Sequence, residues 1–333
     1  MSRDFADKLA WAENHLAGRQ LYSHVPEAED GAMLPDYLAA HFSRFDRAGW
    51  IWAIELGHVT VNNRPAAPDT TLKRHDRVGY FPPEEPEPDA VLDYRVVYED
   101  ADLLVIDKPG DLCVHPTGPF FRHTLWHLVG SKYGEIRFVH RIDRETSGLV
   151  IAARTRCAAA AMNNGGTPVR KEYLALVVGD FRGRVHAKGF LVHDKSSAVW
   201  KKKRFVFADS PEAASIQLDP SAETAVTKLT RESIVPPDMT LVRAVLGTGR
   251  QHQVRATLYS LGFPLAGDKL YGPDERLFLK IKSQSLTDAD RALLRFKRQA
   301  LHAAVLEFRH PFTGKTIHCE SPFPWPDFIG LTR

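Results

Sequence analysis

The sequence predicts an α/β (α+β) protein, with a large mixed, mostly antiparallel sheet, flanking helices and a small αββ-type module in front. After residue 91, apolar runs of strand length alternate with amphipathic segments of helical spacing, which is typical of a sheet covered by helices. The stretch 82–90 is rich in proline and acidic residues and has little to bury, as expected of an extended linker. The 333 residues, 44% of them hydrophobic, suffice for one large core and one smaller core. We therefore expect a module at 1–81 and a domain at 91–333.

The module at 1–81 shows two helical and two strand patterns. Apolar residues recur at helical spacing in "MLPDYLAAHF", and a second helix in "WIWAIELG" is closed by Gly57. "HVTVNN" then alternates as a strand, and its two asparagines predict a turn. "DRVGYF" is predicted as another strand. Together these segments predict a small αββ-type unit.

The domain at 91–333 alternates between predicted strands and short helices. Strands are predicted for "RVVYED", "DLLVIDKP", "IRFVHRI", "GLVIAAR", "KEYLALVVG" and "TLVRAVLG". Helices are predicted for "HTLWHLVGSKYG", for "RCAAAAMNN" with Thr155 as its cap and Gly165-Gly166 after it, and for "RQHQVRATLYSLG" closed by Gly262. No repeat of fixed period is visible, so the segments predict one mixed domain.

Composition excludes several classes of protein. No apolar stretch approaches the roughly 20 residues needed to cross a bilayer. The first residues lack the apolar core and cleavage site of a signal peptide, so we expect a cytoplasmic protein. Cys113, Cys157 and Cys319 are odd in number, far apart and in no CxxC pair, which argues against a disulfide framework and against a zinc site.

Positive charge is concentrated between residues 182 and 204, although the net charge of the chain is only +3. This segment contains eight lysines and arginines and a single acidic residue, Asp194. A solvated surface loop explains such a run as well as a polyanion partner does. The charge pattern alone leaves both interpretations open.

Asp143 lies in "RFVHRIDRETSGLV", where a predicted strand ends and the turn formers after it begin. Such strand ends are rigidly held and exposed, which suits an active site. Taken alone, the motif is explained better by a turn acid paired with Arg141. A catalytic interpretation therefore needs support from elsewhere in the chain.

A second cluster of polar residues lies at 246–272. Gly247 and Gly249 predict a tight turn into a helix. Helical spacing places His252, Arg255 and Tyr259 on one face, and Val254, Leu258 and Leu261 on the buried one. A Gly-x-Gly without the rest of a nucleotide fingerprint is a weak signal, so we expect no nucleotide cofactor.

Five segments of the chain carry distinctive motifs: "VYEDADLLVIDKPGDLCVHPTG", "HRIDRETSGLV", "RKEYLALVVG", "GTGRQHQVRATLYSLGFPLAGDKLYG" and "ALHAAVLEFRHPFTG". In this order they resemble the motifs of the RluA family of pseudouridine synthases. The second matches HRLDxxTSGL, with Ile142 in place of the usual leucine. In addition, "ELGHVTVNNRPAAPDTTLKRHDRV" resembles an S4-type RNA-binding domain, although acids and tryptophans replace the basic pair that usually opens its second helix.

The resemblance implies an isomerisation without cofactor or metal, in which the N1–C1′ bond of a uridine in RNA is broken and C5 bonds to C1′. It makes Asp143 the essential carboxylate, acting as nucleophile or as base on the ribose. Tyr173 corresponds to the aromatic residue that stacks on the target base, and Arg255 to the partner of the aspartate. The expected RNA-binding residues are Arg141, Arg250, His252, Lys201, Lys202, Lys203, Arg204, Lys73 and Arg74.

The resemblance favours ribosomal RNA over transfer RNA as the substrate. It also leads us to expect a monomeric protein. Two other functions remain open: an RNA-binding or assembly protein of the same fold without activity, and a glycosidic-bond hydrolase. A hydrolase normally needs two carboxylates, and Asp107 and Asp268 are candidates for the second one beside Asp143. His123 and His127 have the spacing of a metal pair but lack a third ligand. Cys113 near His115 is only a weak signal for a thiol nucleophile.

Overall fold

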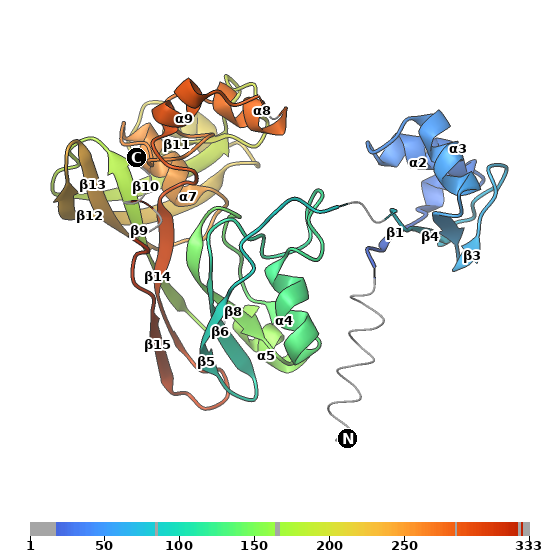
Figure 1. The fold of residues 1–333 in the computed structure, drawn as a ribbon, viewed down its shortest axis with the longest axis horizontal. Coiled ribbons are helices and arrows are strands. Elements are labelled where there is room, and N and C mark those ends of the chain that lie inside the picture. Colours follow the sequence, from blue (N-terminus) through green and yellow to red (C-terminus); the bar gives the residue numbers. More distant parts are fainter. Residues whose placement is uncertain (1–17, 84–85, 164–166, 284, 326–327, 329–333) are drawn as a thin grey trace. The chain divides into compact units, whose positions relative to one another are not determined.

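The computed structural model describes residues 18–83, 86–163, 167–283, 285–325 and Phe328. The chain divides into two compact units, Met1–Pro88 and Asp89–Arg333 (Figure 1). Among the described residues, no helix is long and apolar enough to cross a membrane. The expected glycine stop at 165–166 lies outside the described residues.

The first unit packs two helices and a short 3-10 turn against a small antiparallel sheet of order β1-β4-β2-β3. Its elements are β1 (Leu21–His24), η1 (Glu27–Glu29), α2 (Leu34–His41), α3 (Arg47–Glu55), β2 (Val59–Val61), β3 (Arg64–Pro65) and β4 (Arg77–Tyr80). Leu34, Leu38 and Trp50 are buried in its core, as the helical spacing requires. The sequence interpretation missed β1 and β3, because neither short strand has a clear alternation of apolar and polar residues.

The second unit is built on one large sheet of order β11-β10-β12-β13-β9-β14-β8-β6-β5, with β15 beside β14 and β7 beside β8. Its strands are β5 (Arg95–Glu99), β6 (Leu103–Lys108), β7 (Arg137–Phe138), β8 (Ser147–Ala153), β9 (Val169–Val178), β10 (Arg184–His193), β11 (Lys203–Phe207), β12 (Glu223–Val235), β13 (Met239–Leu246), β14 (Leu301–Arg309) and β15 (Thr316–Glu320). Its helices are α4 (Leu125–Tyr133), α5 (Arg156–Asn163), α6 (Ala213–Gln217), α7 (Gln253–Ser260), α8 (Arg276–Lys282) and α9 (Asp288–Leu294). The predicted mixed, mostly antiparallel sheet is confirmed.

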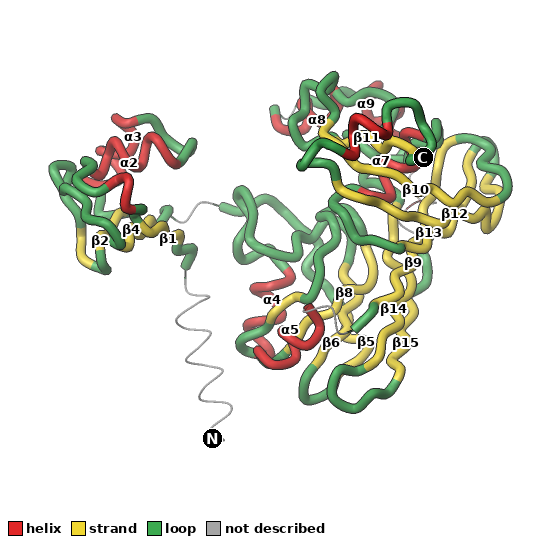
Figure 2. Tube along the Cα trace, turned by 180° about the vertical axis from the view of Figure 1, so that it is seen from behind, coloured by secondary structure: helices red, strands yellow, loops and turns green. Residues whose placement is uncertain are grey.

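The helices gather at two places along this sheet. α4 and α5 lie beside β6 and β8, and α7, α8 and α9 lie near β10 and β11 (Figure 2). Thr155 caps α5 as expected, since its Oγ1 accepts a hydrogen bond from the Ala158 N–H. Separate apolar clusters fill the two regions, one around Val105 and Ile151 and one around Leu191 and Leu270.

β14 joins the two halves of the sheet. It pairs in parallel with β8 and antiparallel with β9, and it lies between them (Figure 1). Gly148 makes the contact with β8 possible: its φ is +106°, and a Cβ there would clash with the Ala303 carbonyl. The chain segments before β8 and on β9 are thereby brought to the same region.

The structure bears on one interpretation that the sequence left open and corrects one expectation. The basic segment 182–204 is no simple loop, because most of its first half is strand β10 and its end begins β11. Helix α7 also has no single buried face, since Arg255 and Gln253 are as inaccessible as Val254. Polar side chains are buried there because each has a partner, which the helical spacing does not reveal.

Candidate active site

Asp143 lies in the loop between β7 and β8, at the wall of a cavity of about 280 Å³. A tight turn holds it, in which the Thr146 N–H donates to the Asp143 carbonyl at 3.1 Å. Among the described residues that line the cavity, Asp143 is the one acidic side chain. The other lining residues are Arg141, Ile142, Thr146, Tyr173, Leu246, Gly249, Arg250, Gln251, His252, Gln253, Val254, Arg255 and Leu301.

Arg255, on α7, lies between two carboxylates. Its Nη1 donates to Asp143 Oδ2 at 2.7 Å. Its Nε and Nη2 donate to the two oxygens of Asp268 at 2.7 and 2.9 Å. Asp268 is fully buried and also accepts from the N–H groups of Leu270 and Tyr271. The guanidinium is therefore fixed by Asp268 and presents one N–H to Asp143.

The charge of Arg255 decides the ionisation of Asp143. Desolvation by burial opposes the charged form, but the nearby guanidinium outweighs it, with smaller help from His252, and the pKa of Asp143 falls to about 2. Asp143 is therefore an anion at neutral pH. Arg141, the partner that the isolated motif suggested, is exposed, and it has no ion pair with Asp143 in the described part of the chain.

His252 precedes α7 in a left-handed conformation, with a φ of +59°. Its Nε2 lies 3.9 Å from Asp143 Oδ1, and its Nδ1 lies 3.1 Å from the Tyr271 hydroxyl. That hydroxyl accepts from the Lys203 N–H, so its own proton is available for His252 Nδ1. Burial and the charge of Arg255 lower the pKa of His252 to about 4. The neutral imidazole then directs its Nε2–H toward Asp143.

Tyr173 is held in the cavity wall by β9. Its strand neighbours in register are Ala244 on β13 and Ala303 on β14, two small residues that leave room for a ring. Burial raises the pKa of Tyr173 above its usual range, and the negative charge of Asp143 adds to this effect. Tyr173 therefore presents a neutral aromatic side chain close to Asp143.

Lys108 supports the Asp143 turn from behind and was not identified from the sequence. The buried Lys108 donates from Nζ to the carbonyls of Pro109 and Arg144, at 2.7 and 3.1 Å. Burial, with a contribution from Arg298, lowers the pKa of Lys108 to about 7. The "DKP" segment belongs to a motif that resembles the family, but a lysine in a strand gives no sign of burial by itself.

The cations expected to bind RNA are in different environments. Arg141 and Arg250 are exposed and line the cavity. Lys201 is exposed and has no ion pair within the described residues. The next three cations are paired: Lys202 with Glu275, Lys203 with Glu223 and Arg204 with Glu212.

In the first unit, Lys73 and Arg74 are both exposed. The Arg74 guanidinium pairs with Glu27 at 3.2 Å, and both of these side chains are largely exposed. Such a surface pair holds its arginine only weakly. Contacts of Lys73 and Arg74 with RNA stay a prediction.

One cluster has the composition of a metal site but not its chemistry. Ligand atoms of Asp100, Asp102 and His310 lie within 4.8 Å of one another. His310 Nδ1 accepts from the N–H groups of Phe312 and Thr313, so the ring proton lies on Nε2, 3.0 Å from Asp100. The nitrogen that faces the acids therefore has no free lone pair for a metal.

The other sequence candidates do not converge on a site. His123 and His127 belong to no group of potential metal ligands among the residues described. Cys113 is buried, which raises the pKa of its thiol and disfavours a thiolate nucleophile. Asp107 pairs with Arg95 and accepts from Ser321, and it lines a different cavity from Asp143.

Comparisons with known proteins agree with this geometry. Residues 102–260 match the family described as RNA pseudouridylate synthase. The chain is 31% identical to ribosomal large subunit pseudouridine synthase D of Vibrio vulnificus over 329 residues, 94% of each chain. It is 30% identical to the uncharacterized RNA pseudouridine synthase YlyB of Bacillus subtilis, over 90% of this chain and 92% of that one.

Among solved structures, human RNA pseudouridylate synthase domain containing 1 superposes with a TM-score of 0.54 at 23% identity, covering 73% of this chain and 89% of that one. This likeness concerns the fold. The sequence relatives show that the chain belongs to the RNA pseudouridine synthase family, as its motifs predicted. It is thus an RNA uridine isomerase.

Proposed function

We propose that Asp143 is the catalytic carboxylate of this isomerase, with Arg255 as its ion-pair partner and Tyr173 as the aromatic surface for the target base. The observation that carries the proposal is the Asp143–Arg255 ion pair at 2.7 Å in the wall of the cavity. Attack on C1′ and proton removal at C2′ of the ribose both require an ionised carboxylate. The guanidinium keeps Asp143 ionised when a bound nucleotide excludes water.

A single carboxylate suffices for this reaction. Glycosidases flank the scissile bond with two carboxyl groups. One protonates the leaving group, and the other activates water or attacks the sugar. Within the described lining of the cavity, Asp143 has no acidic partner, and Asp268 is engaged by Arg255 and two backbone N–H groups. An isomerase keeps the uracil in the cavity, so no water has to be activated.

The target uridine must leave its stack to reach Asp143. Extrusion of a base from structured RNA costs stacking energy, and an aromatic side chain offsets part of that cost. The ring of Tyr173 lines the cavity, and its β-strand holds it rigidly. Arg141 and Arg250, exposed at the same cavity, supply positive charge for the phosphates next to the extruded nucleotide.

We infer that the substrate is large-subunit ribosomal RNA. Ribosomal large subunit pseudouridine synthase D of Vibrio vulnificus and that of Xylella fastidiosa are 31% and 30% identical to this chain over nearly its full length. Pseudouridine mapping in ribosomal and transfer RNA from a deletion strain and its parent tests this. Loss of a site in ribosomal RNA supports the inference, and loss confined to transfer RNA overturns it.

The catalytic assignment is tested by Asp143→Asn, which removes the charge and keeps the shape. We expect D143N to bind RNA and to form no pseudouridine, while D107N, outside the cavity, stays active. Pseudouridine formation by D143N would refute the role of Asp143. Wild-type protein that binds RNA without isomerising any uridine would favour an assembly role, and released uracil would favour a hydrolase.

A further inference from the structure

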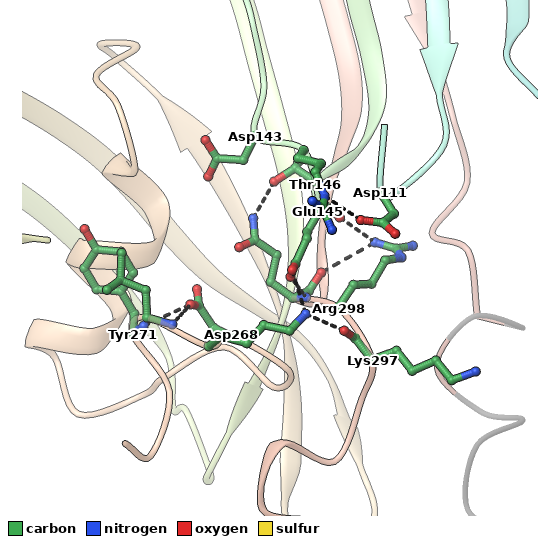
Figure 3. A network of polar contacts seen from close by, with 12 residues as sticks. Asp111, Asp143, Glu145, Thr146, Asp268, Tyr271, Lys297 and Arg298 are labelled. Carbon is green, nitrogen blue, oxygen red and sulfur yellow. Dashed lines mark hydrogen bonds and ion pairs between the residues drawn. The ribbon is translucent and has the colours of Figure 1, made fainter. Parts of the chain in front are cut away.

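Glu145 lies two residues after Asp143, yet it does not line the cavity described above. The two side chains leave the turn in different directions, and Glu145 points toward Lys297 and Arg298 (Figure 3). Glu145 Oε1 accepts from Lys269 Nζ at 2.6 Å, and Oε2 accepts from the Gln299 N–H at 3.0 Å. Both oxygens of this carboxylate are therefore engaged by groups from distant parts of the chain.

Lys269 directly follows Asp268, the residue that fixes Arg255. Lys269 is buried, and its Nζ donates both to Glu145 and to the Lys297 carbonyl. The consecutive residues Asp268 and Lys269 thus reach the Asp143 turn at two points. Asp268 acts through Arg255 on Asp143, and Lys269 acts directly on Glu145.

The turn is held mainly by contacts from other parts of the chain. Residues 139–146 belong to no strand, and the internal hydrogen bond of the turn links Thr146 N–H to the Asp143 carbonyl. The Asp143–Arg255 ion pair holds the turn on the side of the cavity, and Lys108 holds the Arg144 carbonyl. The Glu145–Lys269 ion pair holds the turn on the other side and so helps to fix the direction of the Asp143 carboxylate.

The surrounding hydrogen bonds lock the second contact in place. Arg298 donates to the Glu145 carbonyl at 3.0 Å, and Gln299 Nε2 donates to Thr146 Oγ1 at 2.7 Å. Both donors belong to the segment that leads into β14. Among these donors, Lys269 supplies the positive charge that neutralises the Glu145 carboxylate. Gln299 donates to that carboxylate through its backbone N–H, and Arg298 donates to the Glu145 backbone carbonyl.

We propose that Glu145 and Lys269 form a positioning ion pair that sets the orientation of Asp143 for catalysis without touching RNA. This rests on the proposed role of Asp143. The pair affects the chemical step through geometry, and a misplacement of about 1 Å in an active site can cost roughly a hundredfold in rate. RNA affinity should depend little on it, because neither side chain faces the cavity.

The test uses full-length Glu145→Gln, Lys269→Met and the double variant. Single-turnover pseudouridine formation and RNA affinity by filter binding are measured below each variant's melting temperature. We expect each single variant to lose about tenfold to a hundredfold in rate and to keep its RNA affinity within about twofold. The double variant should be no slower than the slower single one, because both changes break the same pair.

Lys280→Met is the matched control, since it breaks the Lys280–Asp290 ion pair, whose residues do not line the cavity. K280M should retain the wild-type rate. An unchanged rate in folded E145Q, a parallel loss of rate and RNA affinity, or multiplicative losses in the double variant would overturn the positioning role. Should D143N be active, the proposed function fails as well; an inactive D143N beside a normal E145Q rejects the positioning pair alone.

Discussion

Arg255 donates to Asp143 at 2.7 Å across 112 residues of chain, and the same guanidinium binds Asp268 through its other two donating groups. Asp268 therefore fixes the position of the guanidinium, and the remaining N–H group contacts Asp143. Because Asp268 carries a full negative charge in a buried place, the trio has one positive and two negative charges. The nearby His252 is neutral at physiological pH and does not balance the second negative charge.

Replacing Arg255 with lysine separates the two functions of the guanidinium. A lysine ammonium cannot match the two parallel bonds to Asp268 while it donates to Asp143. Loss of a hydrogen bond to a charged group costs roughly 1.5–3 kcal/mol, which lowers the melting temperature by several degrees. R255K should show this shift in a thermal melt together with a strong loss of single-turnover rate; wild-type values for both would contradict the arrangement.

Tyr173 should act on RNA mainly through its ring. We expect Y173F to bind substrate RNA within about twofold of wild type, and Y173A to bind more weakly by roughly 1–3 kcal/mol, the usual value of one stacked base. Filter-binding titrations with the substrate RNA measure the difference. Equal binding by Y173F and Y173A would show that the ring does not stack on the target base.

The four neighbouring cations at 201–204 should differ in their contribution to RNA binding. Lys201 is exposed, whereas Arg204 makes two hydrogen bonds with Glu212 at 2.8 Å each. K201A should weaken binding and reduce the slope of log affinity against log salt by about 0.7–0.9, the value of one phosphate contact. R204A is the matched control and should leave the slope unchanged; the reverse result would place the phosphate contact at Arg204.

His140 should make stability fall as the solution becomes acidic. Burial, with a contribution from Lys171, lowers the pKa of His140 from 6.5 to about 3, and its Nε2 accepts from the Ile151 N–H at 3.3 Å. Between these two pH values the unfolded chain binds the proton and the folded chain does not, so stability decreases as pH falls through this range.

The variant His140→Gln isolates this effect, because a glutamine oxygen can still accept from Ile151 and does not titrate. Melting temperatures of wild type and H140Q are compared between pH 7 and pH 5, above the range in which most carboxylates titrate. We expect a smaller decrease for H140Q. An identical decrease in both proteins would mean that His140 is protonated in the folded state.

The sequence predicted the pairing of Asp143 with Arg255, because each lies in a motif that resembles one family. It did not predict that Asp268 is the second partner of Arg255, since a sequence motif does not distinguish a buried aspartate from an exposed one. Arg141 was the nearer partner for Asp143 along the chain, but its side chain is exposed instead. Ion-pair choice depends on tertiary distance, which spacing in sequence does not contain.

The fold shows a similar division. Strands with continuous apolar runs, such as β6 and β8, were predicted because both of their faces are buried. β10 and β12 were not predicted, since polar side chains interrupt them, as in the exposed end of β12. β11, β14 and β15 were not predicted either. The strand order was also beyond prediction, because pairing between β14 and the two distant strands β8 and β9 is non-local.

The place of β14 has a consequence for biosynthesis. β8 follows Asp143 and β9 carries Tyr173, and in the sheet formed by the described residues these two strands are joined by β14, which begins at Leu301. A ribosome that has translated the first 300 residues has made every proposed catalytic side chain without the strand that joins them. The Asp143 and Tyr173 segments can therefore be joined through the sheet only after the segment that begins at Leu301 has been synthesised.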